Sequence, residues 1–231
     1  MGHSQRFTTH AALDTGYEPL NLGLLNRGWP LGSLVEVCQE AMQGEWLLFA
    51  PALLELRGLV VLLNPPAMPF SQALIQAGLD LDRLVVVAAT DKNQFISCFV
   101  ELCRASLGAL LAWQPKAGLG YTELRKCQLA ATEGKGVAVI FRPVAAQQQS
   151  SPASLRLYSR LLATGVEITI FKQKGYLQTQ QAKPVILPLP GHWQAALPFH
   201  QLNQTPMVDE HTDHQAQPQA LASVIPLRGK P

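Results

Sequence analysis

Residues 34–46 read LVEVCQEAMQGEW and join a short apolar strand to a polar loop. Leu34 to Cys38 is apolar at four of its five positions, which is typical of a buried strand. In a phosphate-binding loop such a strand leads into G-x-x-x-x-G-K-[ST]. There the backbone amides surround the phosphates, the lysine balances their charge, and the hydroxyl binds magnesium. Nucleotide binding by this chain therefore depends on the residues that come after Cys38.

The loop keeps one glycine of that motif and lacks both of its reactive side chains. Gly44 stands at the second glycine, Glu45 at the lysine position and Trp46 at the serine or threonine position. At ~4 Å and an effective dielectric constant of about 20, replacing the ammonium by a carboxylate turns about 4 kcal/mol of attraction into a similar repulsion. The indole has no oxygen for magnesium. We therefore expect a degenerate phosphate loop that binds no cofactor and no metal.

The second half of an ATPase site is also missing. A P-loop enzyme ends a neighbouring buried strand with Asp or Glu, which holds magnesium. The matching strand here, Ala109 to Ala112, ends instead in Trp113, Gln114 and Pro115. The segment from Glu36 to Lys183 also contains no histidine, the commonest general base. The sequence therefore predicts no catalytic residue and a protein that is not an enzyme.

Short strands alternate with helices along most of the chain. The spacing predicts strands at 34–38, 59–63, 84–88, 109–113, 136–141 and 166–172, and helices at 46–57, 71–77, 94–106 and 121–132. Residues 152–162 are compatible with a short helix or an extended arm. This alternation predicts an α/β fold, with a mostly parallel sheet and helices on both faces.

Composition divides the chain into three parts. Residues 1–30 form an irregular leader, residues 31–176 the α/β core, and residues 177–231 a Pro- and Gln-rich tail that we expect to be largely disordered. The start of the chain has no apolar signal region, and its apolar runs are too short to span a bilayer. We therefore expect a cytoplasmic protein without membrane contact.

Charge is unevenly distributed around a net +2. Residues 1–124 contain seven Lys or Arg and eleven Asp or Glu, whereas residues 125–183 contain nine and two. The basic segment 125–183 could face DNA, an acidic protein or solvent. No aromatic residues interleave its charges as a single-strand platform requires, so only a weak DNA contact is expected.

The four cysteines are Cys38, Cys98, Cys103 and Cys127. They have no C-x-x-C spacing and no nearby histidine, and three of them lie in apolar segments. Free cysteine in such segments behaves as a small hydrophobic residue. Buried, unpaired thiols are therefore expected.

Several short motifs together resemble one known family. They are Thr15-Gly16, GWPLGSLVEV at 28–37, AMPFSQALIQAGLDLDRL at 67–84, GALLAWQ at 108–114, QLAA at 128–131, FRP at 141–143, SPA at 151–153 and LRL at 155–157. Their order and spacing over residues 10–175 resemble the ImuA proteins. These are RecA-like accessory factors, encoded beside a Y-family polymerase homologue and used in SOS-induced translesion synthesis. The resemblance implies a RecA-like core and a role in DNA repair, with RecA and an ImuB-like polymerase homologue as partners.

The segment 34–157 is also similar to SulA, the SOS cell-division inhibitor that binds FtsZ and blocks septum formation. Three features favour ImuA: the leader through Gly28-Trp29-Pro30, the strand at 166–171 and the longer tail. SulA chains generally end soon after the segment that matches Leu157. The division inhibitor remains the alternative interpretation.

Without catalysis, function has to lie in surfaces that bind partners. Trp113 and Arg142 follow strands whose carboxyl ends form the edge at which α/β folds bind ligands. Alternatively, Trp113 and Trp46 fill the vacated nucleotide pocket, which is the favoured interpretation, and Arg142 caps a helix. Further candidates are Lys172 and Lys174 on the basic face and Val224, Ile225 and Leu227 in an apolar island at 221–227. That island could add to a partner's groove or sheet edge, serve as a degradation signal, or have no role.

Overall fold

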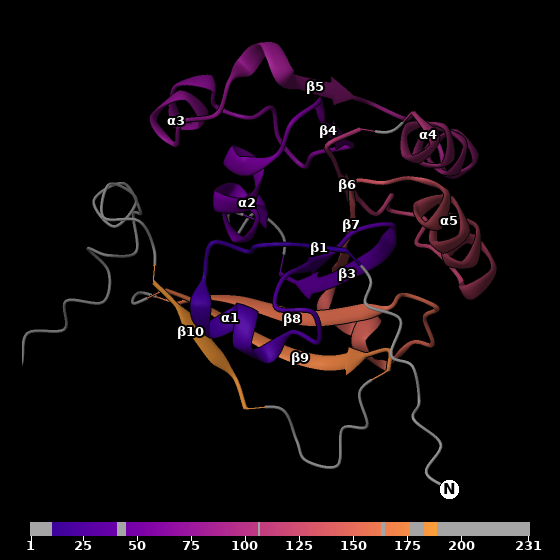
Figure 1. Cartoon of the computed structure of the whole chain (residues 1–231). Coiled ribbons are helices and arrows are strands. Elements are labelled where there is room, and N and C mark those ends of the chain that lie inside the picture. The colour runs from indigo at the N-terminus through magenta and orange to yellow at the C-terminus, as the bar shows by residue number, and fades with distance from the viewer. Residues whose placement is uncertain (1–10, 41–44, 106, 163–164, 176–182, 189–231) are drawn as a thin grey trace, which may run out of the picture.

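A computed structural model describes residues 11–40, 45–105, 107–162, 165–175 and 183–188. Within these ranges the chain is mixed α/β, with an eight-stranded sheet flanked by helices (Figure 1). The sheet contains β3 (Ser33–Gln39), β4 (Val60–Leu63), β5 (Leu84–Val87), β6 (Ala109–Trp113), β7 (Val137–Pro143), β8 (Leu155–Leu162), β9 (Gly165–Gln173) and β10 (Val185–Leu187). The helices are α1 (Glu18–Gly23), α2 (Ala50–Glu55), α3 (Ser71–Gln76), α4 (Lys92–Arg104) and α5 (Tyr121–Glu133), with 3-10 turns η1 (Glu45–Leu48), η2 (Leu81–Arg83) and η3 (Val144–Gln148).

The strands follow one another across the sheet in the order β10-β9-β8-β3-β7-β6-β4-β5. Strands β8 to β5 of this series are parallel, and β9 and β10 continue it antiparallel. In chain order the parallel strands run 3-2-4-5-1-6, which is neither the 3-2-1-4-5-6 nor the 2-1-3-4-5 order of the common dinucleotide-binding sheets. The first parallel strand, β3, therefore lies inside the sheet between β7 and β8.

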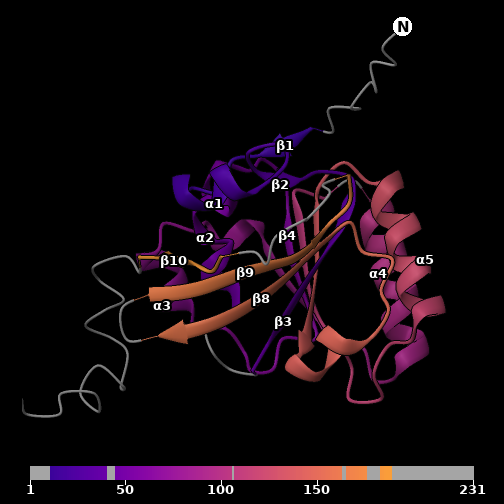
Figure 2. The same cartoon turned by 90° about the horizontal axis from the view of Figure 1, so that it is seen from below.

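Alternate side chains of the strands are buried in two apolar clusters, one on each face of the sheet. Val35, Val60 and Leu111 pack with α1 and α2 on one face. Leu34 and Leu110 pack with α4 and α5 on the other. Figure 2 shows α4 and α5 on one side of the sheet and α1, α2 and α3 on the opposite side. The predicted layering, with helices on both faces, is confirmed.

The start of α4 is fixed by a side-chain cap. The carboxylate of Asp91 accepts hydrogen bonds from the backbone amides of Asn93 and Gln94 at 2.8 and 2.9 Å. These amides have no partner within the helix, so the cap satisfies two of its free donors. Phe95 and Phe99 then lie one turn apart and are fully buried. The helix predicted at 94–106 therefore forms, two residues earlier than expected.

One segment was left open by the sequence, and another differs from the prediction. Residues 155–162 form β8, parallel to β3 with Val35 opposite Leu155, so this part of segment 152–162 takes the extended alternative and not the helical one. The helix predicted at 46–57 is divided into η1 and α2, because Pro51 stands in the first turn of α2. Proline lacks an amide hydrogen and suits the first turn of a helix, not its interior.

The predicted leader contains regular structure from Ala12 onward. It comprises α1 and an antiparallel pair, β1 (Ala12–Leu13) with β2 (Trp29–Pro30). Trp29 is fully buried, and a Cβ on Gly16, whose φ is +79°, would lie 2.2 Å from the Cβ of Pro51. The leader is thus packed directly against α2. Residues 185–187 of the predicted tail form β10; residues 1–10, 176–182 and 189–231 lie outside the described ranges.

No helix in these ranges is both long and apolar enough to cross a membrane. The four cysteines are unpaired, as expected. Cys38, Cys103 and Cys127 are buried, and burial raises the pKa of each of these thiols to about 12. Cys98, on α4, is only partly buried.

The difference in burial between Cys98 and the other three cysteines predicts which thiols react in the native protein. Because the thiolate is the nucleophile, at pH 8 we expect one fast-reacting cysteine per native chain, and three that react only when the chain opens. Titration with Ellman's reagent, with and without urea, measures both classes. The Cys98→Ser variant should lose the fast phase and keep the slow one. Two or more fast thiols in the native protein would contradict this assignment.

Candidate functional site

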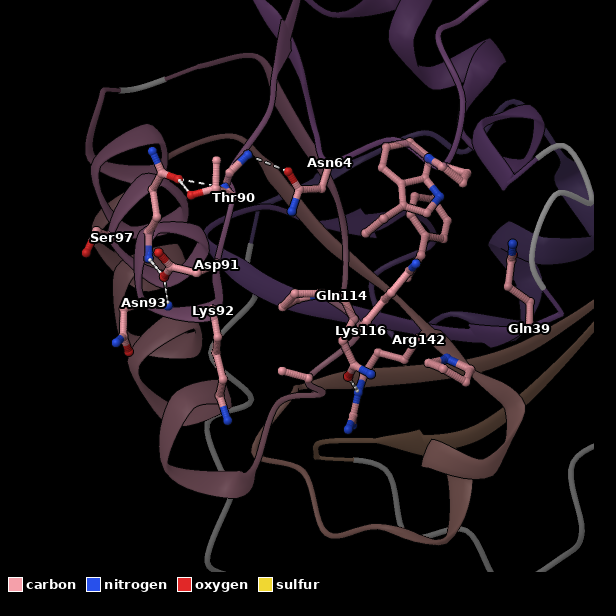
Figure 3. A pocket seen from close by; sticks show the side chains of 18 of the residues that line it. Gln39, Asn64, Thr90, Asp91, Lys92, Asn93, Ser97, Gln114, Lys116 and Arg142 are labelled. Atoms are coloured by element: carbon pink, nitrogen blue, oxygen red, sulfur yellow. Dashed lines mark hydrogen bonds between the residues drawn. The ribbon is translucent and has the colours of Figure 1, made fainter.

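A groove of about 1230 Å³ runs along the carboxyl edge of the parallel strands (Figure 3). Its lining comes from the residues that end or follow neighbouring strands: Gln39 at the end of β3, Asn64 after β4, Thr90 after β5, Gln114 after β6, and Arg142 near the end of β7. The first turn of α4 forms a further wall. This is the edge where open α/β sheets bind ligands, which makes the groove the candidate site.

Hydrogen bonds hold the rim of the groove in one arrangement. Asn64 has φ = +55°, a left-handed conformation that Asn tolerates better than most residues. Its Oδ1 accepts a 2.6 Å hydrogen bond from the amide of Ala89, which ties the end of β4 to the loop after β5. Thr90 donates from its amide and its hydroxyl to Oε1 of Gln94, at 2.6 and 2.8 Å. The polar rim is therefore preformed.

Beneath this rim, aromatic side chains pack against one another on one face of the sheet. Trp113 stacks on Phe141 with ring centroids 4.7 Å apart, and Phe141 meets Phe49 edge-on at 5.9 Å. Phe49 in turn lies 4.5 Å from Trp29. Trp113 is half-buried, and its Nε1 is buried without a hydrogen-bond partner. The interpretation of Trp113 as a packing residue is thus supported, although one side of it still faces the groove.

The predicted phosphate loop is only partly described. Gly44 lies outside the described residues, and Glu45 begins η1 with its side chain also outside them. Trp46 is half-buried and packs against the same apolar cluster as Trp113. The degenerate loop therefore stays a prediction.

A fully buried carboxylate lies deeper in the sheet, on β3. Glu36 has no solvent exposure, and its Oε1 accepts hydrogen bonds from Nη1 of Arg142 at 3.0 Å and from Nε and Nη2 of Arg156 at 3.0 and 2.6 Å. Its other oxygen, Oε2, accepts from the hydroxyl of Ser151 at 2.5 Å. Both carboxylate oxygens are thus satisfied, as a buried charge requires.

Strand register brings these residues together. Arg156 on β8 lies directly opposite Glu36, and Arg142 on β7 lies opposite Cys38, two positions further along β3. Side chains two positions apart on a strand point to the same face. Ser151 enters from the η3–β8 connection, which crosses over this face. Both arginines are therefore aimed at one carboxylate by the sheet itself.

The remaining guanidinium hydrogens bind groups around the cluster. Arg142 donates from Nε to Gln114 at 2.7 Å and from Nη2 to Gln149 and the Leu119 carbonyl at 2.7 and 3.1 Å. Arg156 donates to the Ala146 carbonyl at 2.8 Å and lies 4.8 Å from the centroid of the Phe171 ring. Arg142 also lines the groove, so the buried cluster and the groove share a wall.

The two predicted basic residues differ in their surroundings. Lys172 is half-buried and donates from Nζ to the Ser151 carbonyl at 2.6 Å. Burial, followed by the charge of Arg156, lowers the pKa of Lys172. Lys174 is exposed. Lys172 therefore holds the η3–β8 connection in place through the Ser151 carbonyl. Of these two lysines, only Lys174 is exposed at the surface.

Several predicted site residues need correction or stand apart. Arg142 was predicted as an interface arginine or a helix cap; its side chain is instead only 1% exposed and forms an ion pair with Glu36. Val224, Ile225 and Leu227 lie outside the described residues. Sequence reasoning did not assign a role to Glu36, Ser151 or Arg156. The available signal was a single charge within each of the apolar strands LVEVC and LRL, since buried charges are almost always paired.

Comparison with known proteins gives no further identification. The chain matches no protein-family model, and no curated protein matches it.

Proposed function

We propose that this chain is a non-catalytic accessory protein of the SOS response, with a RecA-like core and a degenerate phosphate loop. It acts in translesion DNA synthesis and DNA repair by docking onto RecA and a Y-family polymerase-like partner. One observation carries the proposal most strongly. Glu36, Arg142, Ser151 and Arg156 come from four of the motifs that resemble ImuA, and they meet in one buried cluster beside the groove.

The chemistry at the carboxyl edge supports docking over catalysis. The end of β6, where a P-loop enzyme carries its magnesium-binding acid, holds Trp113 stacked on Phe141. Asp91, which also lines the groove, is occupied in capping α4. The rest of the lining is mainly amides, hydroxyls, prolines and lysines, together with the exposed residue Glu40.

The groove rim offers a direct test. Lys116 is exposed and lines the groove after β6, whereas Lys135 is exposed just before β7, at the opposite edge of the sheet. We expect Lys116→Glu to weaken binding to purified RecA or to the polymerase-like partner roughly tenfold, because a rim charge mainly alters association. Lys135→Glu should bind like the wild type. Biolayer interferometry with the full chain at two salt concentrations measures both affinities.

Two outcomes would contradict the proposal. The first is a folded wild-type chain that binds neither partner. The second is cell filamentation on overexpression together with stalled FtsZ assembly, which would assign the chain to the division-inhibitor class that residues 34–157 also resemble.

A further inference from the structure

One side of α5 is not covered by the rest of the described chain. The helix packs with α4 on one face of the sheet and buries Leu124, Cys127 and Ala131 there. Figure 1 shows α5 at the periphery of the molecule, beside α4. Its larger exposed side chains recur at steps of three and four residues and so lie on one side of the helix. We call this side the outer α5 face; it comprises Tyr121, Arg125, Lys126, Leu129 and Glu133.

The middle of the outer α5 face is apolar. Leu129 is 46% exposed, and Tyr121, two turns earlier, is 55% exposed. Arg125 and Lys126 lie one turn before Leu129, on either side of it. Tyr and Arg are among the residues that most often carry the binding energy of an interface. An apolar centre between two cations therefore suits a protein partner better than solvent.

The acidic side chains at the two ends of α5 are already engaged. At the amino end, Glu123 forms an ion pair with Lys92 at 2.8 Å. At the carboxyl end, Glu133 and Glu101 share Arg104, at 2.7 and 3.3 Å. The amino-end pair is thereby neutral, and the carboxyl-end group keeps one negative charge in excess.

The middle of the face carries two positive charges that no acid offsets. Arg125 and Lys126 are exposed, and neither takes part in an ion pair within the described residues. Lys135, also exposed, follows the helix and offsets the excess acid at its carboxyl end. The uncompensated charge therefore lies in the first half of α5, where acidic groups of a partner would be attracted.

The occupant of this face has to satisfy its own backbone. The backbone groups of α5 bond within the helix, so the face offers no ladder to an extended chain. An extended segment would set unpaired polar groups against Leu129, whereas a helix pairs them internally. A nucleic acid would gain from the two cations alone and would set phosphates against Leu129 and Glu133. A second copy of this face would bring like charges together. An acidic amphipathic helix matches every feature of the face.

We propose that the outer α5 face docks an amphipathic helix of a partner protein. Acidic side chains of that helix meet Arg125 and Lys126, and its apolar side chains cover Tyr121 and Leu129. None of these four residues lines the groove at the carboxyl edge. The inference therefore goes beyond the docking proposed at the groove, because it adds a second surface and the chemistry of its occupant.

A stapled peptide tests the face directly. A fluorescein-labelled helix of alanine, leucine and glutamate, with its leucines and glutamates on one side, should bind the full chain saturably in fluorescence anisotropy. Arg125→Glu should weaken this binding roughly tenfold or more, and Leu129→Ser several-fold. The matched control is Arg57→Glu, at an exposed arginine just after α2 on the opposite side of the sheet, which should leave binding unchanged. The same peptide with glutamine in place of glutamate should bind much more weakly.

Four results would overturn the inference: no saturable peptide binding, equal binding by the glutamine peptide, unchanged binding by Arg125→Glu, or a DNA duplex that displaces the peptide and that Arg125→Glu releases. Photo-cross-linking to the wild-type chain removes any dependence on the folding of a variant. A cross-linker among the leucines should attach within residues 121–133, and attachment at the groove instead would also overturn the inference.

RecA binding, measured in parallel, keeps the two proposals apart. Peptide binding by a chain that binds neither RecA nor the polymerase-like partner would count against the proposed function alone. RecA binding by a chain that does not bind the peptide would count against the outer α5 face alone.

Discussion

Replacing Glu36 by glutamine is expected to lower the free energy of unfolding by about 3–5 kcal/mol, because it leaves two buried arginines without a carboxylate. Because glutamine keeps the shape of the side chain, the lost free energy of unfolding would come from the missing charge and not from a cavity. Glu36 is fully buried, and the side chains of Arg142 and Arg156 are 1% and 7% exposed. Urea unfolding followed by circular dichroism measures the change.

A surface ion pair provides the matched control. Glu18 lies 2.8 Å from Arg27, but both side chains are about two-thirds exposed, at 66% and 65%. Glu18→Gln should leave the urea midpoint almost unchanged, since solvent screens such pairs. A Glu36→Gln variant as stable as Glu18→Gln would show that the cluster contributes no net stability.

Replacing all three charged members of the cluster separates the effect of charge pairing from that of burial. Glu36→Leu combined with Arg142→Met and Arg156→Met removes every charge and keeps apolar bulk. We expect this triple variant to be markedly more stable than Glu36→Gln, because no buried charge is left unpaired. The residual difference from the wild type would reflect the hydrogen bonds that the arginines make to Gln114, Gln149 and the Leu119 and Ala146 carbonyls.

The layers of the fold follow from local sequence patterns, whereas β8 does not. Strands such as 109–113 are short apolar runs between turns and helices, and these were predicted to within a residue or two. Residues 155–162, LRLYSRLL, suit either a helix or a strand. Their pairing with β3, more than 100 residues earlier in the chain, decides the outcome. Such long-range pairing leaves no local signature.

The candidate site could be predicted only in part, because its residues too come from segments far apart in the sequence. The carboxyl edge could be located from the strand ends, and Trp113 could be placed on it. The partners of Glu36 could not be identified, because Arg142 and Arg156 lie 106 and 120 residues further along the chain. A lone charge in an apolar strand indicates that a partner exists and does not say which. Arg142 was consequently predicted as an interface arginine or a helix cap, although its side chain is buried in the ion pair with Glu36.

Trp29 decides whether the leader is part of the core. It is fully buried, and its ring centroid lies 4.5 Å from that of Phe49 on the α2 side of the sheet. We expect Trp29→Ala to lower the free energy of unfolding by about 3–5 kcal/mol, from lost burial and the cavity that remains. Leu22→Ala, on α1 of the same leader but 65% exposed, should change it little. Urea denaturation of the full-length variants gives both values.

A second substitution at Trp29 separates the ring from its polar atom. The Nε1 of Trp29 is buried without a hydrogen-bond partner, which costs about 1–3 kcal/mol for such a group. Trp29→Phe removes this unsatisfied donor together with part of the ring, so we expect it to be much less destabilising than Trp29→Ala. If Trp29→Ala were as mild as Leu22→Ala, the leader would be a peripheral attachment. The aromatic series from Trp29 through Phe49 and Phe141 to Trp113 would then stabilise the groove without depending on its first member.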